Sequence, residues 1–185
     1  MAAPSDAQLS ADVVEAAAGS VAAFERIYHR LSPSVASYLR WNGASDVDAL
    51  TNEVLAQVHR NLDRFSGDGA GFRSWVFTIA HRRMIDDRRR SSRRPVISHA
   101  EISDDAVVGD AESDALDAIS DTRLQALLEH LSPDQRSVLL LRIVVDLPLE
   151  EVATTLGKTV GAVKALQHRA LATLRRYLDA QEEEP

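Results

Sequence analysis

The sequence contains no cysteine, so disulfide bonds, thiolate metal ligands and a thiol redox switch within the chain are excluded. It also lacks any run of about 18 apolar residues, the length that a membrane-spanning helix needs. Residues 1–8 show no basic stretch followed by an apolar one, so we expect no signal peptide. We therefore expect a cytoplasmic protein with no membrane insertion of its own.

Aromatic residues amount to only 5% of the chain, whereas alanine and leucine are common, and this balance favours helices over sheets. Catalytic groups are equally sparse, because no nucleophile–base set, metal-ligand cluster or phosphate-binding loop stands out. His81 with Asp86 and Asp87 comes nearest to a metal site, but the arginines beside them would repel a cation. We therefore expect no enzyme, no metal and no cofactor.

Positive charge is in the minority, since the formal net charge is −7, but it is concentrated in two segments. Residues 72–95 contain eight arginines against two aspartates, and residues 158–176 contain five basic residues and no acid. Residues 98–121, between them, contain eight acids and no lysine or arginine. Because nucleic-acid binding depends on where charge lies rather than on its sum, this pattern predicts two basic modules.

Apolar residues at helical spacing predict helices throughout the first half. One stripe consists of Val14, Ala17, Val21, Phe24, Tyr28 and Leu31. Ser32 and Pro33 form a cap and first-turn pair that predicts a second helix, which Asn42-Gly43 ends. Ser45, with Asp48 three residues later, predicts the cap of a third helix. The apolar face of that helix consists of Val47, Leu50, Val54, Val58 and Leu62.

Residues 66–71 contain three glycines, too many to sustain a helix, and predict a loop. A fourth helix follows, extends into Arg88–Arg90 and ends near Pro95. Its inward face consists of Phe72, Trp75, Val76, Ile79 and Ala80. Taken alone, Trp75 fits the core better than a base-stacking platform, and the arginine run is either a solvated tail or a nucleic-acid contact.

The second half contains a separate helical pattern. Residues 96–120 are acidic and poor in large apolar side chains, which predicts a flexible linker. Ser132–Gln135 is a capping box that opens an apolar helix through Val145. The predicted fold is all-α, with two small helical domains at residues 10–95 and 121–178 joined by this acidic flexible linker.

Ala153, Gly157 and Val163 have the spacing of a helix-turn-helix. The first helix must be small where the second crosses it, the turn needs a residue at positive φ, and the second helix must reach the core. The face that the second helix would present to the major groove consists of Thr159, Lys164, Ala165, His168, Arg169 and Arg175, with Thr159 also able to cap it. The alternative is a plain helical hairpin with a solvated basic face.

Together these segments resemble the extracytoplasmic-function (ECF) sigma factors over residues 20–178. The sequences "FERIYHRLSPSVASYL", "DVDALTNEVL" and "FRSWVFTIAHRRMIDDRRR" are similar to domain two of that family. The sequence "LSPDQRSVLLLRIVVDLPLEEVATTLGKTVGAVKALQHRALATLRR" is similar to domain four. The resemblance implies a protein that binds core RNA polymerase and promoter DNA and starts transcription, with an anti-sigma factor as a further partner.

The resemblance also assigns roles to residues. The surface that would grip the polymerase clamp consists of Asp46, Asp48, Asn52, Glu53 and Gln57. The residues that would hold the melted promoter element near the start site are Ser66, Asp68, Trp75, Arg82, Arg83, Arg89 and Arg90. The second helix of the helix-turn-helix would read the farther promoter element. The acidic linker would occupy the basic nucleic-acid channel of the polymerase.

Five positions depart from the family pattern, one of them Arg82, which replaces a small polar residue. Ala49 replaces an acid on the clamp surface, and Pro148 replaces a serine cap, although proline is tolerated at a helix start. Leu166 and Gln167 are exchanged relative to the usual order, so we expect Leu166 in the core and Gln167 exposed.

Two other functions fit the basic segments less well. A one-component transcription regulator would need a ligand pocket or a dimerisation helix in the first half, where a polar helix, a glycine loop and an arginine-rich helix occur instead. An adaptor that binds an acidic protein would need basic helices, but this function would not explain the helix-turn-helix spacing.

Overall fold

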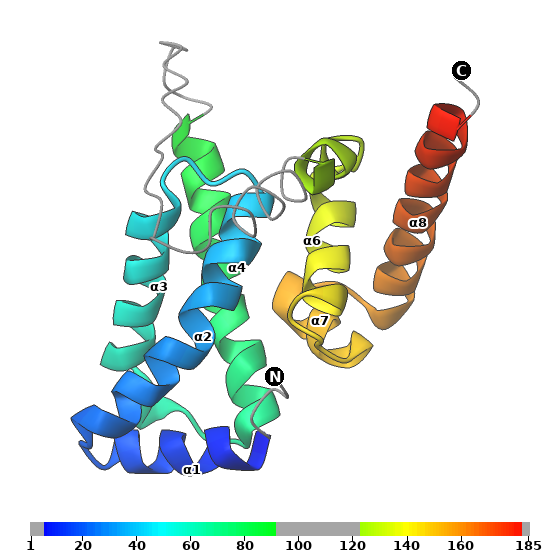
Figure 1. The fold of residues 1–185 in the computed structure, drawn as a ribbon. Coiled ribbons are helices and arrows are strands. Elements are labelled where there is room, and N and C mark those ends of the chain that lie inside the picture. Colours follow the sequence, from blue (N-terminus) through cyan, green and yellow to red (C-terminus); the bar gives the residue numbers. More distant parts are fainter. Residues whose placement is uncertain (1–5, 92–122, 183–185) are drawn as a thin grey trace.

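The computed structural model describes residues 6–91 and 123–182, and all regular elements within them are helical (Figure 1). The elements are α1 (Asp6–Ala17), α2 (Val21–Trp41), α3 (Val47–Arg60), the 3₁₀ helix η1 (Leu62–Arg64), α4 (Gly69–Ser91), α6 (Pro133–Ile143), α7 (Leu149–Leu156) and α8 (Val160–Glu182). Residues 123–129 are also helical. The predicted linker, residues 96–120, lies outside the described ranges.

The first module is a bundle of α2, α3 and α4 with α1 lying across one end (Figure 1). Its core is built from the apolar stripes of the three long helices and includes Ile27, Val35, Leu39, Val54, Val58, Phe72, Val76 and Phe77. The predicted inward faces of α3 and α4 are largely confirmed, since Leu50, Val54, Val58 and Ile79 are buried. Trp75 is only half-buried, at the edge of the core.

The stripe predicted from Val14 to Leu31 is wrong as a single helix. Ala17 ends α1, and Ser20 caps α2 by accepting a hydrogen bond from the Ala23 amide at 3.3 Å. The turn between the helices changes the face that points inward, so Val14 and Val21 are 70% and 81% exposed. The apolar residues of α1 and α2 happen to keep a helical spacing across the turn between the two helices, so the sequence pattern did not reveal the turn.

Pro33 was predicted to begin a helix. In the structure it lies inside α2. A proline in a helix removes one backbone hydrogen bond and disfavours the preceding turn. The apolar residues on both sides, Leu31 and Val35, are buried in the core and hold the helix continuous. The predicted helix end at Asn42-Gly43 is confirmed, because Asn42 is the C-cap of α2.

The cap of α3 is Asp46 and not the predicted Ser45. The Asp46 carboxylate accepts a hydrogen bond from the Ala49 amide at 2.9 Å. Ser45 instead donates its amide and hydroxyl to the buried Asp87 carboxylate, at 2.9 and 2.6 Å. The competing contact comes from the far end of α4, which no local pattern around Ser45 could reveal.

The predicted loop at residues 66–71 is too long, because α4 begins at Gly69. Asp68 caps the helix, since its Oδ1 accepts a hydrogen bond from the Gly71 amide at 2.8 Å. Glycines in a first turn cost little when a side chain satisfies the free amides. Residues 65–68, hereafter the recognition loop, therefore form the connection between η1 and α4.

The second module is built around α6, whose residues 137–141 are all buried. The predicted capping box is confirmed in full: Ser132 accepts from the Gln135 amide, and the Gln135 side chain accepts from the Ser132 amide. The helix ends at Ile143, slightly before the predicted Val145. An ion pair of 2.8 Å between Lys158 and Asp134 joins the helix-turn-helix to the start of α6.

The two modules contact one another through α4 with α7 and α2 with α6, as Figure 1 shows. The contact includes polar pairs. Thr78 of α4 donates to the Thr155 hydroxyl at 3.4 Å, and Ser137 of α6 donates to the Asn42 amide oxygen at 3.0 Å. The sequence does not predict this docking, because isolated serine and threonine residues carry no positional signal.

His81 lies at this junction, with its Nδ1 2.9 Å from the Tyr38 hydroxyl. Burial lowers the pKa of His81 to about 4; Arg88 and Lys158 add to this effect and Asp134 opposes it. Because the unfolded chain takes up the proton first, stability should fall as pH drops from about 6.5 to 4, by up to about 3 kcal/mol.

Denaturant unfolding at pH 7 and pH 4.5 tests this expectation. His81→Gln removes the titrating group, so this variant should lose less stability between the two pH values than the unaltered chain. Equal losses would show that His81 does not contribute to the acid sensitivity.

Candidate nucleic-acid interface

The helix-turn-helix predicted from three residues is confirmed. Ala153 of α7 is 5% exposed and Val163 of α8 is fully buried, so both reach the core. Gly157 forms the turn with φ +62° and ψ +36°, the left-handed conformation that favours glycine. The backbone of this turn therefore fixes the angle at which α8 leaves α7.

The outward face of α8 is available to a ligand. All its predicted DNA-facing residues are exposed: Thr159, Lys164, Ala165, His168, Arg169 and Arg175. Thr159 also caps the helix, because its hydroxyl accepts a hydrogen bond from the Ala162 amide at 3.2 Å. Leu166 packs against the core as predicted, whereas Gln167 is partly buried and not exposed. No acid lies between Lys158 and Arg176, so the face carries no negative charge.

The predicted polymerase-binding residues lie on the surface of α3, opposite its buried face. Asp46, Asp48, Asn52 and Glu53 are exposed and Gln57 is half-buried. Ala49, where the family has an acid, is also exposed. We call these six residues the α3 face. It has two edges, one toward α2 and one toward α4.

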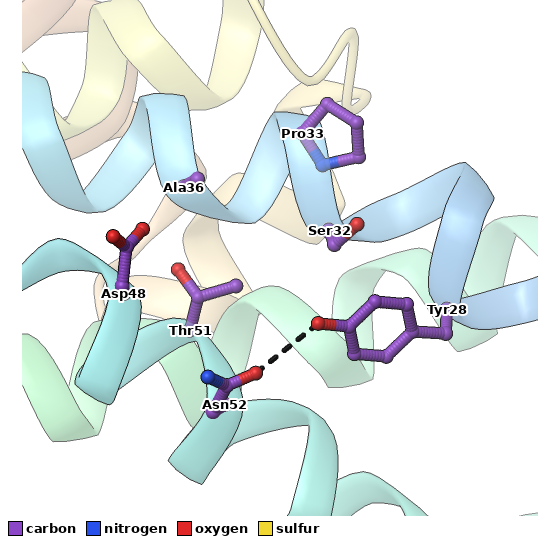
Figure 2. A pocket seen from close by; sticks show the side chains of 7 residues that line it. All are labelled: Tyr28, Ser32, Pro33, Ala36, Asp48, Thr51 and Asn52. Carbon is purple, nitrogen blue, oxygen red and sulfur yellow. Dashed lines mark hydrogen bonds between the residues drawn. The ribbon is translucent and has the colours of Figure 1, made fainter. Parts of the chain in front are cut away.

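The edge toward α2 forms a surface pocket of about 370 Å³ (Figure 2). Asp48 and Asn52 line it from α3, and Tyr28, Ser32 and Pro33 line it from α2. The Tyr28 hydroxyl donates a hydrogen bond to the Asn52 side chain at 3.1 Å, which fixes the orientation of that amide. Sequence reasoning missed Tyr28 because its spacing matched the apolar stripe of α2.

The edge toward α4 is tied to an arginine that was predicted to contact DNA. The Arg83 Nε donates to the Gln57 side-chain oxygen at 3.1 Å, and the Arg83 guanidinium lies 3.6 Å from the Glu53 carboxylate. Arg83 thus joins the predicted polymerase surface to the predicted DNA surface. Arg82, Arg89 and Arg90 are exposed along the rest of α4.

The recognition loop borders an aromatic cluster. The Phe65 ring lies 5.1 Å from Phe72 and 5.3 Å from Trp75, measured between ring centroids. Phe65 and Trp75 are half-buried, whereas Ser66 and Asp68 are exposed. Flat faces of this kind can stack on an unpaired base. The predictions did not include Phe65, because the loop was expected to begin after it.

Among the helices of the described ranges, none is both long and apolar enough to cross a bilayer. Across residues 6–91 and 123–182, no group of three or more histidine and acidic side chains is arranged to hold a metal ion.

The fold and the exposed basic helix define a two-module DNA-binding protein whose second module is a helix-turn-helix. Residues 27–94 match the family described as Sigma-70 region 2, and residues 121–174 match Sigma-70, region 4. The ECF RNA polymerase sigma factor BldN of Streptomyces coelicolor is 35% identical over 182 residues, which cover 96% of this chain and 69% of BldN. SigD of Mycobacterium tuberculosis is 34% identical over 176 residues, which cover 91% and 82%.

The structure of CnrH in complex with the cytosolic domain of CnrY matches with a TM-score of 0.71 and 25% identity, covering 95% of this chain and 99% of CnrH. The chain belongs to the ECF sigma factors of the sigma-70 family. It binds RNA polymerase and directs promoter recognition, with region 4 binding DNA. Because this family is non-enzymatic, the expectation of no catalytic activity is confirmed.

Proposed function

We propose that three surfaces divide the work of initiation within the two modules, residues 10–95 and 121–178. The α3 face anchors the chain on polymerase, the recognition loop and α4 hold the near promoter element, and α8 reads the far element. The observation that carries this proposal is the split of α3 into a buried apolar face and an exposed acidic and amide face. Polar groups that the fold leaves exposed are accessible to a partner.

The recognition loop is suited to capture one base of the melted strand. Duplex DNA hides base edges, so a base must leave the stack, which costs a few kcal/mol that pocket contacts must offset. Asp68 is exposed and uses Oδ1 to cap α4, so its second oxygen is left to accept from an exocyclic amine. Phe65 and Trp75 supply aromatic surface beside it, and Arg82, Arg89 and Arg90 supply charge for the phosphates.

Asp68→Asn tests this role without removing the helix cap, since asparagine caps helices as well as aspartate does. The substitution replaces one acceptor by a donor, so discrimination for the preferred base should fall roughly tenfold while polymerase binding is unchanged. Permanganate footprinting of open complexes on a promoter library would measure the preference.

Asp63→Asn, an identical change at an exposed position in η1, is the matched control for Asp68→Asn. An unaltered base preference in the Asp68→Asn variant, with normal opening, would remove the recognition loop from the DNA-binding surface.

The basic face of α8 gives a second expected outcome. If Lys164 contacts a phosphate, Lys164→Ala should weaken binding to the far element and lower the log–log salt slope by roughly 1 unit. Lys158→Ala is a suitable control, because Lys158 is already paired with Asp134 at 2.8 Å. Fluorescence anisotropy over a salt series would separate the two variants. Equal effects would place Lys164 outside the interface.

Three further parts of the proposal concern the whole protein. The acidic composition of residues 96–120 supports a flexible linker that occupies the basic nucleic-acid channel of the polymerase. The function in transcription supports a cytoplasmic location. The likeness to CnrH, whose structure was solved with the cytosolic domain of CnrY, supports an anti-sigma factor as a regulatory partner.

A further inference from the structure

The start of α4 lies against α1, a helix that precedes residues 27–94, the range of the region 2 match. The Gly69 amide donates a 2.7 Å hydrogen bond to the Ser10 hydroxyl, which in turn donates to the Asp6 carbonyl at 2.9 Å. Gly69 follows the recognition loop directly. One hydroxyl of α1 therefore holds the first amide of α4.

The contact is too close for any residue but glycine. A Cβ placed on Gly69 would lie 2.2 Å from the Asp6 carbonyl oxygen, which is a backbone atom and cannot swing aside. Arg73, one turn further along α4, extends to the Asp6 carboxylate at 3.3 Å. A backbone contact at Gly69 and a side-chain contact at Arg73 thus join the first turn of α4 to α1.

The helix that makes these contacts is itself firmly placed. Leu9 and Val13 are buried in the core. The buried Asp12 carboxylate lies 2.8 Å from the Arg26 guanidinium and 3.5 Å from that of Arg30, both on α2. Because α1 is fixed to α2 in this way and also contacts the start of α4, it can hold the end of the recognition loop in one position (Figure 1).

We propose that α1 is a specificity-determining element of this sigma factor, in which Ser10 is a positioning residue for the recognition loop. This inference rests on the proposed base capture by that loop. Ser10 acts through the position of Gly69 and not by contact with DNA. Ser10 fixes the position of Gly69 through the hydrogen bond. Because Asp68 precedes Gly69 directly, the position of Gly69 in turn fixes where the Asp68 carboxylate meets the base.

Ser10→Ala removes the acceptor of the Gly69 amide and adds no bulk. Discrimination for the preferred base at the near element should fall roughly threefold to tenfold, the range that loss of one hydrogen bond gives. A residue that only stabilised the fold would lower the melting temperature without changing base preference. Asp6→Asn, which weakens the Arg73 contact, should shift preference in the same direction.

The test uses the full-length chain assembled with core polymerase and the same promoter library. Val14→Ala is the matched control, because Val14 is an α1 residue that is 70% exposed and should leave preference unaltered. Circular dichroism confirms that each variant is helical.

Comparison with Asp68→Asn separates two kinds of failure. If Asp68→Asn shifts preference and Ser10→Ala does not, the inference about α1 is overturned and the base-capturing loop stands. If neither variant shifts preference, the recognition loop does not capture a base and both proposals fail. A shift in both, with none in Val14→Ala, supports the positioning role.

Discussion

Reversing the charges at Asp48 and Glu53 should reduce binding to core RNA polymerase by about 100-fold or more, the loss that accompanies disruption of close interfacial charge pairs. Both residues are exposed on the α3 face, so lysine can replace them without entering the core. Glu53 gives up a surface contact with Arg83, which contributes little to stability. Helicity by circular dichroism should therefore be unchanged.

The control must carry the same change in total charge, because polymerase surfaces attract or repel a protein through its net charge as well. Asp63→Lys with Asp179→Lys meets this condition, because both positions are exposed and neither belongs to the α3 face. We expect this double variant to bind polymerase nearly as well as the unaltered chain. If the two double variants lose affinity equally, the α3 face is not the anchor and only bulk charge matters.

Asp12→Ala should lower the free energy of unfolding by about 3 kcal/mol. The Asp12 carboxylate is 1% exposed and lies between the guanidinium groups of Arg26 and Arg30. Arg30 is itself only 18% exposed, so removing the carboxylate leaves a partly buried cation without its counter-charge. Guanidinium denaturation would measure the loss.

Glu15→Ala is the matched control for Asp12→Ala. Glu15 pairs with the same Arg26 at 2.7 Å, but its carboxylate is 57% exposed. Pairs in water contribute little, so this substitution should have a much smaller effect. Comparable losses in the two variants would show that burial of the Asp12 carboxylate does not determine its contribution.

Short-range patterns are the parts of this fold that sequence reasoning predicts well. The Ser132–Gln135 capping box and the Ala153–Gly157–Val163 spacing are both formed in the structure, because each depends on residues close together in the sequence. Because Val163 must point into the core, the same spacing also predicts which residues of α8 are exposed.

The features that sequence reasoning missed depend on contacts between distant segments. Ser45 does not cap α3, because its amide and hydroxyl bind the Asp87 carboxylate. Gly69 begins a helix beside Ser10, 59 positions earlier in the chain. Pro33 continues α2 because buried neighbours on both sides outweigh its local cost. The docking of α7 on α4 is equally hidden, since Thr155 resembles any other helix residue until its partner is known.

In the proposed division of work, the α3 face, the recognition loop and α8 together place RNA polymerase on a promoter. The most direct measurement is run-off transcription from a selected promoter with core polymerase and either the unaltered chain or the Asp48→Lys, Glu53→Lys double variant. We expect a promoter-dependent transcript with the unaltered chain and none with the double variant, although the double variant still binds the far element through α8. Normal transcription by the double variant would show that the α3 face does not anchor the chain on polymerase.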